Sequence, residues 1–167
     1  MILGNLVTPE VIRLAMAEVR QGTEAAGRDP GAIVVAGWAT CIVADDPAPI
    51  REMMRATAGH MVATSPEFAI EALGVDRGAV ETLRAAYRAG GPAATAPHVT
   101  PQMVDGLTLI DTPANLAARL RALGRAGISE FTVLMPAAGA EGSHAVATFD
   151  HRKNLERFAA EVAPQLT

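Results

Sequence analysis

The stretch Ile33-Val34-Val35-Ala36-Gly37-Trp38-Ala39-Thr40-Cys41-Ile42-Val43 decides the fold class. It carries no charge, it is apolar at both odd and even positions, and it is rich in β-branched residues. This pattern predicts a strand that is covered on both faces, as the central strands of parallel sheets are. The sequence therefore predicts an α/β protein built on a parallel sheet.

Further strands and helices alternate around this stretch. Ile2-Leu3 reads as the stub of a strand, and Phe131 to Met135 as a second buried strand. Several helices begin at a hydroxyl residue followed by proline, in which the hydroxyl caps the helix and the proline fits its first turn. These pairs are Thr8-Pro9, Ser65-Pro66, Thr100-Pro101 and Thr112-Pro113. The alternation calls for right-handed crossovers between parallel strands.

The predicted strands form a sheet that is too small for the number of helices predicted to cover it. We expect a single domain over residues 1–167, with a helical excursion at about 47–99 after the central strand. Two strands and a stub leave backbone groups unpaired at the sheet edges. The sequence thus predicts that the chain pairs with a second copy of itself or belongs to a larger domain.

Length and composition exclude several classes of protein. The chain has 167 residues, whereas a complete (β/α)8 barrel needs roughly 200 or more. A net charge of −4 and an aromatic content of 4% argue against a nucleic-acid partner. The single cysteine, Cys41, cannot form an intramolecular disulfide, so we expect a reducing, cytoplasmic location. The longest apolar run, 32–44, is too short to span a bilayer, so no membrane partner is expected.

Five segments occur in an order and spacing that resemble a known family. They are Leu3 to Glu10, Ala25 to Pro30, Val34 to Trp38, Val43 to Pro47, and Ile110 to Phe131. Together they look like the C-terminal part of luciferase-like monooxygenases, within the methylenetetrahydromethanopterin reductase-like oxidoreductases that use coenzyme F420. The sequence departs from the family pattern at Asp111, where the family usually has glycine.

The resemblance implies a partial (β/α)8 barrel, about the last three βα units. Met1 to Leu3, Ile33 to Val43 and Phe131 to Met135 would then be its sixth, seventh and eighth strands. The implied activity is hydride transfer between coenzyme F420, or alternatively FMN, and a small organic substrate, in which the cofactor carries the chemistry. Whether the chain is an enzyme by itself stays open, because the strands that hold most of the family's substrate pocket are absent.

Three interpretations of the chain remain open at this point. In the first it works with a complementary barrel half, and in the second it is a half-barrel that forms a homodimer and has a flavin-binding, structural or regulatory role. In the third it is an unrelated small α/β enzyme, which would require additional strands within Thr57 to Leu73.

Three places carry candidate cofactor contacts, each with a simpler structural explanation. The segment from Gly4 to Thr8 stands at a helix N-terminus that could hold a phosphate, or it could only cap the helix. The loop from Pro136 to His144 could cradle an anion, or be an ordinary surface loop. Trp38 could lie against an isoalloxazine-like ring, or belong to the core. The residues predicted to contact the cofactor are Gly4, Asn5, Leu6, Thr8, Trp38, Thr40, Pro136 and Gly139.

No catalytic side chain and no metal site are predicted. The four histidines show no metal-ligand spacing, and a Gly-x-Ser-x-Gly nucleophile motif is missing from the sequence. Cys41 lies within an apolar strand, where a thiol behaves as a small hydrophobic group. These features argue against a hydrolase.

Overall fold

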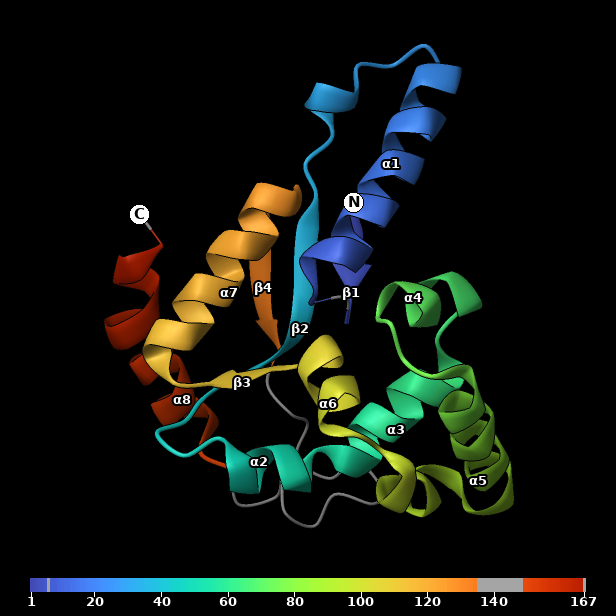
Figure 1. Ribbon diagram of the computed structural model, residues 1–167. Helices are drawn as coiled ribbons and strands as arrows, with labels where there is room; N and C mark the ends of the chain where they lie inside the picture. The colour runs from blue at the N-terminus through green and yellow to red at the C-terminus, as the bar shows by residue number, and fades with distance from the viewer. Residues whose placement is uncertain (6, 135–148, 167) are drawn as a thin grey trace.

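The computed structural model describes residues 1–5, 7–134 and 149–166. Within them the strands form one parallel arrangement, with helices packed against it and a group of helices extending to one side (Figure 1). The strands are β1 (Ile2–Gly4), β2 (Ala36–Val43), β3 (Leu109–Asp111) and β4 (Glu130–Leu134). This is the predicted α/β architecture, and it matches part of a (β/α)8 barrel.

The described helices follow the predicted alternation with the strands. The larger ones are α1 (Pro9–Ala25), α2 (Ala48–Met53), α3 (Arg55–Thr64), α4 (Glu67–Ala72), α5 (Arg77–Thr95), α6 (Pro101–Leu107), α7 (Pro113–Ala126) and α8 (His151–Arg157). Short helical turns are η1 (Pro30–Ala32), η2 (Ala96–His98), the π-helical η4 (Phe158–Val162) and η5 (Ala163–Gln165). No described helix is long and apolar enough to cross a membrane.

β2 is the centre of the sheet, and it uses its two edges differently. β1 pairs with Ala36–Trp38 and β4 with Ala36–Thr40, while β3 pairs with Cys41–Val43. The backbone N–H and C=O groups of even-numbered residues point toward β1 and β3: Asn5 N–H donates to the Trp38 carbonyl, and Ala44 N–H donates to the Asp111 carbonyl. Odd-numbered residues bond toward β4. Hence β1 and β3 lie along one edge of β2, and β4 lies along the other.

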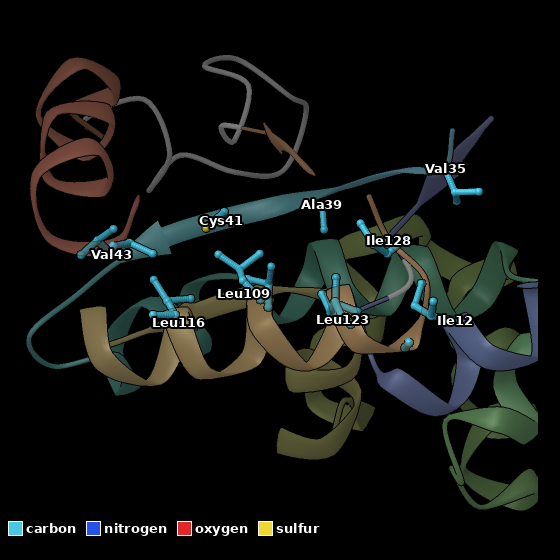
Figure 2. Packing of buried hydrophobic residues seen from close by; sticks show 14 residues of the cluster. Ile12, Val35, Ala39, Cys41, Val43, Leu109, Leu116, Leu123 and Ile128 are labelled. Carbon is cyan, nitrogen blue, oxygen red and sulfur yellow. The ribbon is translucent and has the colours of Figure 1, made fainter. Parts of the chain in front are cut away.

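One face of the sheet carries the main hydrophobic core. Figure 2 shows Ala39, Cys41 and Val43 on β2 beside Leu116 and Leu123 of α7. Ile12 of α1 and Val162 of η4 belong to the same cluster and are fully buried. The three helices therefore cover this face as the outer helices of a barrel cover its strands.

A second hydrophobic cluster holds the helices between β2 and β3 together. Its members come mostly from α3, α4, α5 and α6, and Ile42 of β2 and Val11 of α1 join it to the rest of the chain. Gly59 of α3 allows a close approach, because a Cβ there would lie 1.9 Å from Thr95 Oγ1. These helices span Ala48 to Leu107, and the division into an excursion at about 47–99 stays a prediction.

The structure corrects several predicted boundaries. The central strand starts at Ala36 rather than at Ile33. Ile33 is the C-cap of the 3-10 turn η1, and its N–H donates to the Pro30 carbonyl. The Val35 N–H donates to the Ser129 hydroxyl instead of to a neighbouring strand. β3 was not predicted, since three residues between two helices show no alternation. The interpretation of the chain as an unrelated small α/β enzyme required strands within 57–73. This prediction is wrong, because the stretch falls in α3, a connecting turn and α4.

Candidate functional site

Trp38 and the end of β1 form the most accessible part of the predicted site. Trp38 is the register partner of Gly4, the last residue of β1, and a Cβ on Gly4 would lie 3.9 Å from the indole Cε3. The Trp38 residue is 42% exposed, so it lies outside the hydrophobic clusters of the described residues, and its contact with a cofactor stays a prediction. The indole therefore lies beside Gly4 with part of its surface free for contact.

Asn5 follows Gly4 and adopts an unusual backbone conformation. Its φ of 55° lies in the left-handed region, which asparagine tolerates better than most side chains. Its N–H donates to the Trp38 carbonyl at 2.6 Å, which ends the pairing of β1 with β2. Its side-chain Oδ1 is buried and has no hydrogen-bond donor within the described residues. The structure thus brings together Gly4, Asn5 and Trp38.

These residues belong to a sheet face that the described helices leave open. By strand register, Trp38 shares this face with Ile2 and Gly4 of β1 and with Glu130 and Thr132 of β4. All five are exposed. We call them the open face. In a closed barrel this face lines the interior, opposite the helices.

Two predicted residues are placed less favourably for ligand contact. Thr8 Oγ1 accepts a hydrogen bond from Val11 N–H at 3.4 Å, so the hydroxyl caps α1 as the structural explanation required. Thr40 is only 2% exposed. The remaining predicted contacts, Leu6, Pro136 and Gly139, lie outside the described residues.

A polar cleft, which the sequence did not predict, lies between the start of α1 and the helices α2, α6 and α7. Its volume is about 630 Å³, and Thr8, Gln102 and Arg119 contribute to its lining. Arg119 donates to the carbonyls of Asp105 and Thr108 at the end of α6. Burial lowers the pKa of Arg119, and the nearby carboxylates of Asp105 and Asp111 oppose that shift.

An ion-pair group closes one side of this cleft. Arg51 of α2 lies 2.9 Å from both Asp105 and Asp111, although the Asp105 contact is misaligned for a hydrogen bond. Asp111 also accepts from Thr112 N–H and Asn115 Nδ2. The Asp111 carboxylate thus joins α2 to the start of α7. Thr112 and Asn115 are near Asp111 in the chain, whereas Arg51 is 60 residues away, so the sequence gives no sign of the ion pair.

The described residues offer little for acid–base or metal chemistry. Burial raises the pKa of the Cys41 thiol to about 12, so the thiolate is strongly disfavoured. Among residues 1–5, 7–134 and 149–166, no group of three or more His, Cys, Asp or Glu could hold a metal ion. The site presents an aromatic surface and backbone groups, which suits binding of a planar ring more than activation of a nucleophile.

Comparisons with known proteins agree with this arrangement. The family model described as luciferase-like monooxygenase matches residues 1–130. The chain is 27% identical over 136 residues to a 5,10-methylenetetrahydromethanopterin reductase of Methanolobus tindarius, covering 81% of this chain and 42% of that protein. It is 25% identical over 169 residues to the reductase of the same name from Archaeoglobus fulgidus, covering 99% of this chain and 48% of that protein.

A solved structure shows the same fold. It is the coenzyme F420-dependent tetrahydromethanopterin reductase of Methanopyrus kandleri, with a TM-score of 0.79 and 20% sequence identity. The match covers 99% of this chain and 45% of that chain. This chain therefore spans less than half the length of the relatives to which it is similar.

Proposed function

The chain belongs to the luciferase-like monooxygenase family, and we propose on this basis that it is the C-terminal segment of a coenzyme F420-dependent oxidoreductase. The reaction is hydride transfer between the deazaflavin and a small organic substrate. The cofactor supplies the redox chemistry when it is bound, and the chain's own residues hold and orient it. FMN is the alternative cofactor.

The observation that carries the proposal at the site is the exposed indole of Trp38 beside Gly4 on the open face. An aromatic surface next to a residue without a side chain suits a planar ring system. Asn5 adds a buried acceptor that has no donor among the described residues, so a rotated side chain would be free to accept from a ring N–H. These features fit the ring of a deazaflavin. The cleft beside Thr8 fits a phosphate less well, because three carboxylates accompany its two arginines.

The open face also supports a partner for the chain. Parallel sheets are normally covered on both faces, and Ile2 and Trp38 are large apolar side chains left exposed here. Strands from a complementary barrel half would cover them and complete the ligand pocket. A homodimer formed through the same face is the second candidate, and it is favoured by the same exposed side chains.

Titration with oxidised coenzyme F420 tests the proposal. Trp38 is the chain's only tryptophan, so its fluorescence reports on the site without interference from other indoles. We expect quenching on binding, stronger when the N-terminal half of a related reductase is added, and no comparable signal from Trp38→Phe. If neither F420 nor FMN quenches Trp38 with or without that half, the proposed function is wrong.

The mass of the purified chain in solution separates the two partner hypotheses. If adding the complementary half converts the dimer into a complex of one chain with that half, the result favours the barrel half as partner. A dimer that excludes that half favours the homodimer. A stable monomer with cooperative unfolding contradicts the homodimer.

A further inference from the structure

The last part of β2 extends beyond the strand beside it. β4 pairs with β2 only as far as Thr40, whose register partner is Leu134. β2 continues through Cys41–Val43, which pairs on its other edge with β3. Among residues 1–5, 7–134 and 149–166, no strand pairs with the Cys41 carbonyl or the Val43 N–H on the β4 edge. Both residues are buried, so leaving these groups unpaired would be costly.

The side chain of Asn154 bonds these two backbone groups where the described part of β4 has ended. Its Nδ2 donates to the Cys41 carbonyl at 3.0 Å, and its Oδ1 accepts from Val43 N–H at 2.8 Å. A carboxamide carries one donor and one acceptor group, as a peptide unit does, so it satisfies both backbone groups. Asn154 comes from α8 and is 4% exposed. The bonds thus join two buried parts of the chain that are 111 and 113 residues apart.

The same helix face holds the segment that follows β2. Arg157 lies three residues after Asn154, and its Nη2 is 2.7 Å from Asp45 Oδ1. Its Nε also pairs with Glu161 at 2.9 Å. The Arg157–Asp45 pair lies at the surface, where ion pairs contribute little. The buried carboxamide is therefore the stronger of the two attachments.

We propose that Asn154 is a positioning residue of the candidate cofactor site, because its carboxamide bonds Cys41 and Val43 as a neighbouring strand would and thereby holds β2, the strand that carries Trp38 and Thr40. Since that site is itself a proposal, this role rests on the proposed function. A carboxylate would keep only the acceptor, and a hydrocarbon would keep neither group. Asparagine is thus specifically suited to this position.

The reactivity of Cys41 measures the attachment directly. Cys41 is the only cysteine and is fully buried, so a thiol reagent such as 5,5′-dithiobis(2-nitrobenzoate) reacts only when β2 opens. Asn154→Leu removes both hydrogen bonds and should raise the labelling rate about 10- to 100-fold at fixed pH. Asn154→Asp keeps an acceptor for Val43 N–H and should give a smaller rise. Arg152→Ala, on the exposed side of α8, is the control and should leave the rate unchanged.

Two measurements distinguish positioning from general stabilisation. The emission maximum of Trp38 is recorded well below the unfolding transition, and global stability is obtained from urea unfolding. A positioning role predicts a shifted Trp38 emission in Asn154→Leu and a labelling rate that rises more than the loss of global stability accounts for. The proposal is overturned if the Trp38 emission maximum of Asn154→Leu is unshifted. It is also overturned if the Cys41 labelling rate rises no more than the loss of unfolding free energy accounts for, or no more than it does in Arg152→Ala.

Coenzyme F420 binding tests the link to the site. If coenzyme F420 quenches the Trp38 fluorescence of the unaltered chain, its affinity should be at least about 10-fold lower for Asn154→Leu. Asn154→Asp should restore part of this affinity. An unchanged affinity contradicts the positioning role. If the unaltered chain and the chain with its complementary half both fail to bind any flavin, the proposed function fails, whereas the labelling and emission results still decide whether Asn154 fixes β2.

Discussion

Replacing Asp111 by asparagine should weaken the connection between α2 and the sheet. The carboxylate of Asp111 accepts from Arg51, Thr112 N–H and Asn115, each at 2.9 Å. The side chains of Asp111 and Arg51 are 13% and 28% exposed, so water screens the pair only in part. At about 4 Å and an effective dielectric constant near 20 the attraction is about 4 kcal/mol, and desolvation offsets much of it. We expect Asp111→Asn to cost about 2 kcal/mol of unfolding free energy.

A double-mutant cycle isolates the Arg51–Asp111 interaction. Urea unfolding is followed by circular dichroism for the unaltered chain, Asp111→Asn, Arg51→Met and the double variant. We expect a coupling energy of about 1 to 2 kcal/mol that persists in about 1 M salt, because the pair is mostly shielded from solvent. A coupling below about 0.3 kcal/mol, or one that disappears in salt, would refute the reasoning.

An exposed ion pair provides the matched control. Arg152 and Glu156 lie 3.7 Å apart on α8, with side chains 78% and 70% exposed. The same cycle on these two residues should give a coupling of no more than about 0.5 kcal/mol, and high salt should abolish it. An equal coupling for the two pairs would mean that burial does not strengthen the Arg51–Asp111 pair.

Three further substitutions have definite expected signs. Gly59→Ala should destabilise the chain by about 1 to 3 kcal/mol in urea unfolding, because the new methyl group would overlap Thr95. Gly22→Ala should stabilise it by about 0.5 to 1 kcal/mol in the same assay, since Gly22 lies within α1 and a Cβ there meets no atom within 4 Å. Burial raises the pKa of Cys41 from 9.0 to about 12, so the unfolded chain loses the thiol proton first as the pH rises. The unfolding free energy should therefore fall above about pH 9 by about 1.4 kcal/mol per pH unit from this group, and Cys41→Ala should remove that part of the slope; identical slopes would contradict the assignment.

The parts of the fold that were predictable from sequence are those with long, uniform patterns. The apolar stretch that contains β2 and the Thr-Pro helix starts are local signals, and local hydrogen bonding and burial determine them. β3 was missed because Leu109–Asp111 is too short to show a period. It forms a strand only because β2 runs past β1, which pairs with Ala36–Trp38, and leaves the same edge free at Cys41–Val43. That condition depends on distant segments.

The candidate site was predictable to a similar extent. Gly4, Asn5 and Trp38 were identified because they lie in or next to predicted strands, and the structure places them together. The ion-pair group of Arg51 and Asp111 was not, since its members are 60 residues apart and each resembles an ordinary surface charge. Asn154 was also missed, because an asparagine near the start of a helix gives no sign that it bonds a strand more than a hundred residues earlier.

The pairing of β2 with β3 has a consequence for how this chain can change during evolution. Val43 and Asp111 are register partners, and Ala44 N–H donates to the Asp111 carbonyl at 3.0 Å. Neighbouring strands lie about 4.8 Å apart, so a chain that passed directly from Ala44 to Thr112 would have only that gap to close. Exchange or shortening of the helices between β2 and β3 therefore has a small loop-closure cost, provided that β3 and Asp111 are kept. We therefore expect the helices of this segment to vary in length and sequence more readily than the strands that flank them.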